Sequence, residues 1–450
     1  MRQAVSKLSP LPFANAKTTR IGITGLSQAG KSTLITSIIN HLENARRGSL
    51  IQQAVLSDVT HGLWRRDAPH AFDYDAGLQA LTHRPPYWPA STTDWSIARI
   101  ELTMARSWYS PKPRKRIIEL FDYPGEWLMD LGLLDWDFAQ FCQALWGWCS
   151  QSPRLKLGNA LVQELSVIDP MAPVDREYLS QLQQRWADFL ADCRLPPHQL
   201  SRNLPGRFLL SGTDYKPGDK PFVPLFSTNL AGGSVPGSFP AQSWGAVCAD
   251  HYKAYRDQEA RPFFERHFQN LDAQVILIDL LGAMTAGQEA LKDMRAALDS
   301  VLQPFRYGQD HWLGRLFRRR IRRVAVCATK IDHLLPEDQK RMQSLLESYL
   351  YETVQRLAAE DIDVNVMAIA AVQSAKLHET PDHTQSLIGR DKRTGERIRF
   401  TPPHLPDNLP HALNLKIEDL PQLSPPEGLD RVQAFPARRI DQLLAFLLAE

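Results

Sequence analysis

The feature that most constrains this chain is a glycine-rich stretch, GLSQAGKS, which runs from Gly25 to Ser32. It follows an apolar run that predicts a buried strand, and it precedes residues with apolar side chains at helical spacing. In such a loop the glycines let backbone N–H groups point inward, and the helix N-terminus adds the positive end of its dipole. The motif therefore predicts a phosphate-binding loop, in which Lys31 reaches the β- and γ-phosphates and Ser32 coordinates Mg²⁺. The residues expected at the phosphates are Gly25, Gln28, Ala29, Gly30, Lys31, Ser32 and Thr33.

Six short apolar runs predict the strands of a single sheet. They are Arg20–Thr24, Ser96–Thr103, Arg116–Phe121, Gln274–Leu281, Val324–Thr329 and Val364–Ala370. Four of them are nearly continuous in apolar residues, as expected of strands buried on both faces. The run at 96–103 alternates instead, which predicts an edge strand with one face in water. Because helical patterns follow several runs, the sequence predicts an α/β fold with a mostly parallel, six-stranded sheet.

Interruptions of this alternation predict the domain organisation. The longest one is mainly helical at first and then rich in proline, glycine and serine, which predicts a large helical insertion. A later proline-rich stretch contains a candidate hairpin around Asp391–Glu396. The predicted segments are a first part of the P-loop domain at 18–126 with a switch insertion at 47–91, the mainly helical insertion at 127–270, the second part of the P-loop domain at 271–376, the proline-rich insertion at 377–430, and a C-terminal helix at 431–450 that packs on the P-loop domain.

A second motif, Asp122-Tyr-Pro-Gly125-Glu126, directly follows the third strand. An acidic residue at the carboxyl end of a parallel strand lies at the same sheet edge as the phosphate-binding loop and can hold Mg²⁺. Gly125 would then offer its backbone N–H to the γ-phosphate. The order of the two motifs favours this function over an ordinary Asp/Gly turn.

A hydroxyl between the first helix and the next strand is expected to contact both Mg²⁺ and the γ-phosphate, so that a switch loop is ordered only by a triphosphate. Thr92, with Thr93 beside it, is the nearest candidate upstream of that strand. Either threonine could instead cap the strand.

A third motif, Thr329-Lys330-Ile-Asp332, closes the fifth strand. A carboxylate at that place can accept hydrogen bonds from N1–H and N2–H of guanine, a donor pair that adenine lacks, and the Lys330 stem can cover the base. Threonine stands where asparagine is more usual. Ser374 and Ala375 follow the sixth strand, and a backbone N–H near Ala375 could donate to guanine O6. The pattern favours guanine.

With these motifs the chain resembles the YcjX-like P-loop GTPases of bacteria, a family associated with stress and phage-shock operons. The resemblance is carried by GLSQAGKST, YDAGLQAL…PPYWPAST, FDYPGEWLMDL, VILIDLLGAM, FRYGQ…LGRLF and ATKIDHL. The expected fold is a Ras-like P-loop NTPase domain that carries the helical insertion. The resemblance implies that Gly25, Gly30, Lys31 and Ser32 bind phosphate and Mg²⁺, that Thr92 belongs to the first switch and Asp122 and Gly125 to the second, and that Thr329, Lys330, Asp332 and Ser374 form the base pocket.

The predicted function is that of a Mg²⁺-dependent molecular switch that binds GTP and GDP and hydrolyses GTP, with a role in the bacterial stress response. Its expected metal ligands are Ser32, Thr92 and Asp122, and its expected catalytic residues are Lys31, Thr92, Gly125 and Glu126. Glu126 stands where many GTPases have a water-orienting glutamine, and it is either a base or a side chain that pairs with an arginine. No arginine finger can be assigned, which predicts slow intrinsic turnover. A P-loop kinase or phosphotransferase and a non-hydrolysing, nucleotide-dependent scaffold are the alternatives.

Composition narrows the cellular setting. The net charge of +2 indicates no general affinity for polyanions, so no nucleic-acid partner is expected. The five irregularly spaced cysteines and the absence of a long apolar run predict a reduced, cytoplasmic protein. An unidentified protein partner is also expected. The basic segment 312–323, which carries six arginines, leaves two interpretations open. In the first interpretation the segment makes a peripheral contact with the anionic inner membrane or with an acidic partner. In the second it is a solvated helix end.

Overall fold

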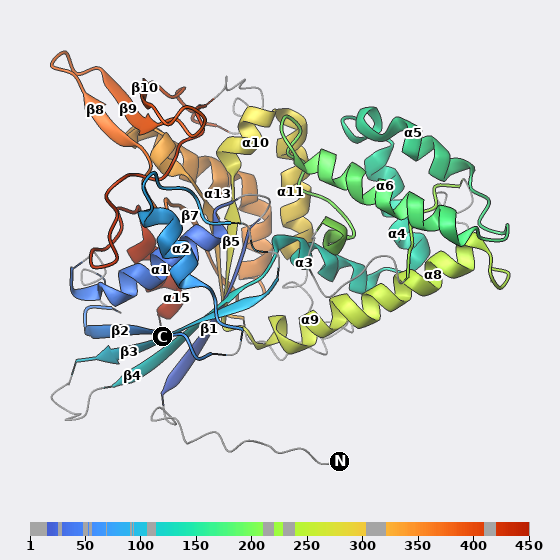
Figure 1. Ribbon diagram of the computed structural model, residues 1–450, viewed down its shortest axis with the longest axis horizontal. Coiled ribbons are helices and arrows are strands. Elements are labelled where there is room, and N and C mark those ends of the chain that lie inside the picture. Colours follow the sequence, from blue (N-terminus) through green and yellow to red (C-terminus); the bar gives the residue numbers. More distant parts are fainter. Residues whose placement is uncertain are drawn as a thin grey trace.

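The computed structural model describes residues 16–25, 29–47, 53, 56–68, 70–90, 92, 94–105, 114–209, 220–227, 239–302, 321–408 and 420–449. A seven-stranded sheet with the order β2-β3-β4-β1-β5-β6-β7 forms its centre (Figure 1). The strands are β1 (Lys17–Gly25), β2 (Val59–Arg65), β3 (Ser96–Met104), β4 (Lys115–Asp122), β5 (Ala273–Ile278), β6 (Arg323–Ala328) and β7 (Asp363–Ala368). Strands β4, β1, β5, β6 and β7 are mutually parallel, whereas β3 is antiparallel to β4 and β2 is antiparallel to β3. The predicted α/β fold with a mostly parallel sheet is confirmed.

Two details of the predicted sheet are wrong. The sheet is not six-stranded, because β2 forms inside the segment 47–91 that was expected to be an insertion. Strand β3 is not at the edge, because β2 pairs with its outer side. The polar positions of β3 have another cause: Arg99 lies 3.0 Å from Glu119 of β4, and Glu101 lies 3.8 Å from Arg65 of β2. Pairing between neighbouring strands lets these charges occupy an internal strand.

Alternate residues of the central strands divide between two hydrophobic cores. Val275 and Leu277 of β5 belong to the core that contains α1 (Lys31–Glu43) and α15 (Ile440–Leu448). Ile276 and Ile278 belong to the core on the opposite face, with α11 (Gln288–Leu302) and α13 (Pro336–Ala358). Both faces of the sheet are therefore covered, which explains why these strands are almost entirely apolar.

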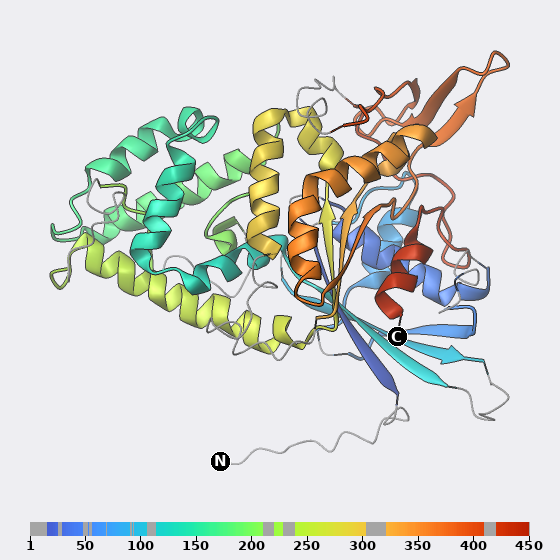
Figure 2. The ribbon, with the colours of Figure 1, turned by 180° about the vertical axis from the view of Figure 1, so that it is seen from behind.

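The core that contains α11 continues into a group of helices beside the sheet, which we call the helical segment (residues 138–266). Figures 1 and 2 show most of this segment on the far side of α11 from the sheet, with α9 reaching back past α11 toward the sheet. Its described helices are α4 (Phe138–Cys149), α5 (Arg154–Val167), α6 (Arg176–Arg194), η4 (Gly206–Leu209), α8 (Trp244–Tyr255), η6 (Arg256–Ala260) and α9 (Arg261–Arg266). Between β4 and this segment lie α3 (Gly125–Met129) and η3 (Asp130–Asp135).

A small antiparallel sheet projects from the opposite end of the molecule (Figure 1). It consists of β8 (Lys376–Glu379), β9 (Gln385–Arg390) and β10 (Arg397–Phe400). The remaining described elements are η1 (Ala45–Arg47), α2 (Tyr74–Thr82), η7 (Phe268–Asn270), α10 (Leu280–Ala286) and η9 (Ile331–His333). None of the helices in the described ranges is both long enough and apolar enough to cross a membrane.

A buried ion network attaches the helical segment to α11. Asp293 of α11 accepts hydrogen bonds from Arg154 Nη1 at 2.6 Å, from Arg202 Nε at 2.8 Å and from the backbone N–H of Ser201 at 2.7 Å. Although burial opposes ionisation, the neighbouring guanidinium of Arg154 and these hydrogen bonds hold the pKa of Asp293 below its usual value. The network therefore places a charged, fully paired group at the junction.

Replacing one partner of this network should cost far more stability than replacing an exposed one. We expect Arg154→Ala to destabilise the protein by about 3–5 kcal/mol, because it leaves a buried carboxylate short of its partner. Arg185→Ala, which removes an exposed arginine paired with Glu164, should cost less than about 1 kcal/mol. Urea unfolding of the two variants measures the difference, and equal losses would contradict this account.

Candidate functional site

The predicted phosphate-binding loop connects β1, which ends at Gly25, to α1, which begins at Lys31. Gly30 precedes the helix with a φ of 81°, in the left-handed region that favours glycine. The N–H groups in the first turn of a helix point toward its N-terminus, which in α1 is the loop side. No described side chain caps α1 by a hydrogen bond to these groups. Ala29 and Thr33 are buried beside the loop. Residues 26–28, which include the expected phosphate ligand Gln28, lie outside the described residues.

Four of the predicted phosphate and metal residues come together at the end of this loop. Lys31 Nζ forms an ion pair with Asp122, which is only 2% exposed at the end of β4. Thr92 Oγ1 donates to Asp122 Oδ2 at 2.8 Å and lies 3.1 Å from Ser32 Oγ. Three separate stretches of sequence thus contribute to one polar cluster. The Thr92 hydroxyl faces this cluster.

The cluster fits the magnesium ion that the sequence predicts. The Thr92 hydroxyl lies within hydrogen-bonding distance of both the Ser32 hydroxyl and the Asp122 carboxylate, and Mg²⁺ prefers such oxygen ligands. Mg²⁺ usually binds few side chains and completes its shell with water and substrate phosphates. Ser32, Thr92 and Asp122 are therefore the residues that would hold it. Among the described residues, no group of three or more His, Cys, Asp or Glu side chains offers another metal site.

Gly125 packs directly on the start of the phosphate-binding loop. A Cβ atom at this position would lie 2.0 Å from the carbonyl oxygen of Gly25, so no larger residue fits without a backbone shift. Glycine is therefore required for the start of α3 to approach β1 this closely. The close approach places Gly125 beside the start of the predicted phosphate-binding loop, and the contact of its N–H with a phosphate stays a prediction.

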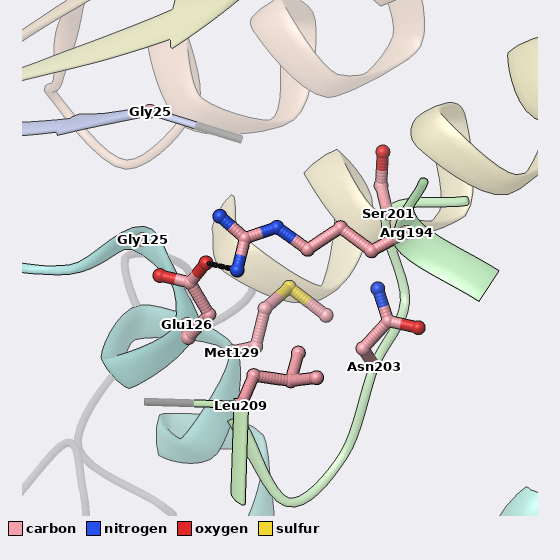
Figure 3. A pocket seen from close by; sticks show the side chains of 8 residues that line it. All are labelled: Gly25, Gly125, Glu126, Met129, Arg194, Ser201, Asn203 and Leu209. Carbon is pink, nitrogen blue, oxygen red and sulfur yellow. Dashed lines mark ion pairs between the residues drawn. The ribbon is translucent and has the colours of Figure 1, made fainter. Parts of the chain in front are cut away.

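Glu126 is paired with an arginine that the sequence analysis missed. Arg194 Nη1, at the end of α6, lies 2.8 Å from Glu126 Oε1. Figure 3 shows both side chains in a pocket between α3 and the helical segment. The pocket is lined by Gly25, Gly125, Glu126, Met129, Arg194, Ser201, Asn203 and Leu209. No motif marks Arg194, since it lies 68 positions after Glu126 and only the packing of α6 brings it here.

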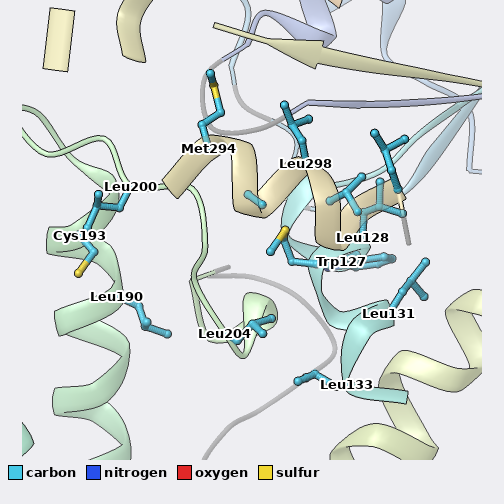
Figure 4. Close-up of a cluster of buried hydrophobic side chains, with 14 of the residues drawn as sticks. Trp127, Leu128, Leu131, Leu133, Leu190, Cys193, Leu200, Leu204, Met294 and Leu298 are labelled. Atoms are coloured by element: carbon cyan, nitrogen blue, oxygen red, sulfur yellow. The ribbon is translucent and has the colours of Figure 1, made fainter. Parts of the chain in front are cut away.

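The residues that follow Glu126 belong to the hydrophobic core next to this pocket. Figure 4 shows Trp127, Leu128 and Leu131 packed between α11 and the helical segment. The guanidinium of Arg207 stacks over the Trp127 ring at 4.4 Å and lies 3.1 Å from Asp130. The residues that follow Gly125 and Glu126 are therefore fixed between two parts of the molecule.

The predicted base-pocket residues also converge. Asp332 Oδ2 accepts hydrogen bonds from the backbone N–H of Ser374 at 2.7 Å, from the Ser374 hydroxyl at 2.8 Å and from the N–H of Ala375 at 3.2 Å. These bonds fix the orientation of the carboxylate, which is 4% exposed. Thr329 donates its hydroxyl to the carbonyl of Ile278 at 3.3 Å and thereby joins β6 to β5.

Two neighbours of this pocket were not predicted. Asp279, which follows β5, accepts from Lys330 Nζ at 2.5 Å, and Lys330 has a φ of 62°. A non-glycine residue in the left-handed region is strained, and such strain is concentrated at functional sites. His333 Nε2 lies 3.0 Å from the Ser374 hydroxyl, and burial lowers the pKa of this imidazole. Asp279 and His333 complete the polar surroundings of Asp332.

All these groups lie at the carboxyl edge of the parallel strands. Lys31 follows β1, Asp122 ends β4, and Asp332 follows β6. The chain leaves β1 with β4 on one side and β5 on the other, so the phosphate-binding loop lies where the strand order reverses. Ligands of open α/β sheets bind at such a point.

Sequence comparison now identifies the family. The sequence profile of the YcjX-like family (DUF463) matches residues 19–450. The chain belongs to the YcjX-like family. This confirms the resemblance drawn from the motifs.

Two relatives in the YcjX-like family carry the name Ras-like GTPase YcjX. The protein of Escherichia coli strain K12 is 27% identical, over 96% of this chain and 95% of its own. The protein of Shewanella oneidensis is 28% identical, over 87% of this chain and 84% of its own. The similarity therefore spans both the sheet and the helical segment.

The close approach of Gly125 to Gly25 can be tested with alanine. Gly125→Ala should destabilise the protein by about 1–3 kcal/mol, because its Cβ must displace backbone. Gly147→Ala is the matched control, since Gly147 lies in α4 and a Cβ there meets no atom within 4 Å. This second variant should be neutral or more stable by about 0.5–1 kcal/mol. Thermal unfolding of both variants checks the contrast, which an unchanged Tm for Gly125→Ala would refute.

Proposed function

We propose that this protein binds guanine nucleotides with Mg²⁺ and hydrolyses GTP to GDP as a molecular switch. The observation that carries the proposal is the placement of two predicted clusters at one sheet edge. Lys31, Ser32, Thr92 and Asp122 form one cluster, and Asp332, Ser374 and Ala375 form the other. The names of the two relatives agree with this function.

In the proposed reaction the oxygen of a water attacks the γ-phosphorus in line with the leaving group. The bond from that phosphorus to the β–γ bridging oxygen breaks, GDP keeps the bridging oxygen, and a proton of the water passes to the released phosphate. Lys31 and the N–H groups at the start of α1 would stabilise the negative charge spread over the transferring group. Bound Mg²⁺ would neutralise phosphate charge, held by Ser32, Thr92 and Asp122.

The switch would respond to the γ-phosphate through two segments. Thr92 lies just before β3, and Gly125 lies at the start of α3. Both already touch the phosphate-binding loop or its cluster, so a third phosphate gives each a new partner. A role in the bacterial stress response, which the family resemblance implies, remains a prediction, and so does an unidentified protein partner. The basic segment 312–323 lies mostly outside the described residues, and its proposed membrane contact also remains a prediction.

Guanine selectivity is the sharpest test of the base pocket. The protein should bind GTP and GDP at least tenfold more tightly than ATP, because adenine lacks the pair of N–H donors that the Asp332 carboxylate would accept from guanine. Asp332→Asn should weaken GTP binding and favour xanthine nucleotides, since an amide can donate to the carbonyl at xanthine C2. Binding titrations of the purified protein measure these preferences. Equal affinities for ATP and GTP would exclude the guanine assignment and favour a P-loop kinase.

Hydrolysis is tested at the phosphate-binding loop. Lys31→Ala should abolish or severely weaken Mg²⁺-dependent binding of GTP and remove single-turnover hydrolysis, since it deletes the cation of the loop. Lys292→Ala, which removes an exposed lysine paired with Glu289, should hydrolyse GTP at the wild-type rate. Tight GTP binding by the wild type without any turnover would leave a nucleotide-dependent scaffold. Wild-type behaviour of Lys31→Ala would place the phosphate site elsewhere.

A further inference from the structure

We propose that Arg194 is a catalytic residue of the proposed GTPase reaction, an arginine finger supplied in cis by the helical segment. The inference rests on the proposed function and adds to it the cation that the sequence could not assign. Arg194 is the last residue of α6, and its guanidinium enters the pocket that Gly25 and Gly125 border (Figure 3). Gly25 opens the phosphate-binding loop, and Gly125 is the residue proposed to meet the γ-phosphate. The pocket therefore adjoins the place where charge develops during hydrolysis.

The backbone that carries Arg194 is fixed by hydrogen bonds, whereas its long side chain extends from the end of α6 into the pocket. The N–H of Leu200 donates to the carbonyl of Cys193 at 2.8 Å, and the N–H groups of Ser201 and Arg202 donate to the buried Asp293. These bonds tie the end of α6 and the following loop to α11. The Arg194 side chain itself is 23% exposed and ends in the pocket. A long side chain on a fixed helix end can exchange partners without moving the fold.

Other described arginines are less suited to this role. Arg207 is 4% exposed, stacks on Trp127 and is paired with Asp130, so it serves the core under α3. Arg65 and Arg66, which precede the first switch, pair with Asp67 and Asp75. Arg194 differs because it forms an ion pair with Glu126, the residue next to Gly125.

The ion pair with Glu126 gives the arginine a holding position. A carboxylate alone beside the γ-phosphate would repel it, and the pair with Arg194 neutralises that charge. A bound triphosphate brings several anionic oxygens to the same place, and a guanidinium binds phosphate through two parallel hydrogen bonds. Transfer of Arg194 from Glu126 to the γ-phosphate would stabilise the transition state and release Glu126 toward the attacking water. Arg194 forms no covalent bond in this step.

The test compares single-turnover hydrolysis with binding of GDP plus aluminium tetrafluoride, which imitates the transferring phosphoryl group. Arg194→Ala should lower the hydrolysis rate about 10³-fold or more, the lower end of the range for arginine fingers, and should lose the aluminium fluoride complex while still binding GDP. Arg194→Lys keeps the charge but not the planar pair of donors, so its rate should be intermediate. Arg185→Ala, which removes another arginine of α6, should leave rate and complex unchanged.

A positioning role for Arg194 predicts different results. If Arg194 only orients Glu126, then Arg194→Ala and Glu126→Ala should lose the same rate, the double variant should lose no more, and the aluminium fluoride complex should persist in both. That outcome overturns the proposal, as does a wild-type rate in Arg194→Lys or Arg194→Ala. If Arg194→Ala fails to fold, as shown by lost GDP binding, the rate of Arg194→Lys at unchanged GDP affinity decides. A wild-type protein that binds GTP without hydrolysing it removes the proposed hydrolysis and this inference together, whereas normal turnover in the arginine variants removes only the inference.

Discussion

The candidate site depends first on Asp122 and its bonds to Lys31 and Thr92. A carboxylate that is 2% exposed must be paired, because leaving it alone would carry a large desolvation cost. Strand register decides where this charge lies, since Asp122 of β4 is aligned with Ile23 of β1, two residues before Gly25. The parallel pairing of β4 with β1 therefore places the Asp122 carboxylate beside the start of the predicted phosphate-binding loop. Lys31 from α1 and Thr92 from the segment before β3 then gather around it.

The second half of the site follows from the same parallel arrangement. Strands β6 and β7 pair in register, so the chain leaves both at the same edge, and Asp332 meets the N–H groups of Ser374 and Ala375. Three hydrogen bonds to one carboxylate oxygen fix its direction. A rigid acceptor favours one base over another, because a mismatched base leaves buried polar groups without partners.

The helical segment is joined to the site by buried polar groups as well as by its core. Asp130, directly after α3, accepts hydrogen bonds from the N–H of Gly206 at 2.7 Å and from the hydroxyl of Tyr255 at 2.5 Å. Arg207 adds an ion pair to the same carboxylate. Because buried polar networks tolerate little rearrangement, α3 cannot shift without repacking against this segment. This network therefore couples the position of α3 to that of the helical segment.

The sequence by itself determined the general fold class, and it predicted the chemistry of the motifs. A phosphate-binding loop needs glycines between a strand and a helix, and buried parallel strands need continuous apolar runs, so both leave local patterns. Lys31, Asp122 and Asp332 could be named from such patterns because each lies directly after a strand or loop whose position was clear. The family resemblance added further motifs to these, and the match to the family covers residues 19–450.

Only the tertiary structure decided how distant segments meet. Strand β2 was missed and β3 was misplaced at the edge, because pairing with a neighbouring strand compensates polar residues that look solvent-exposed in the sequence. Residues 26–28 stay outside what the structure describes, so Gln28 remains a prediction from the motif. The partner of Glu126 could not be read at all, since Arg194 is an ordinary helix-end arginine in the sequence. It reaches the pocket because the packing of the helical segment brings the end of α6 within ion-pair distance of Glu126 in α3, and long-range packing of this kind leaves no periodic signal in the chain.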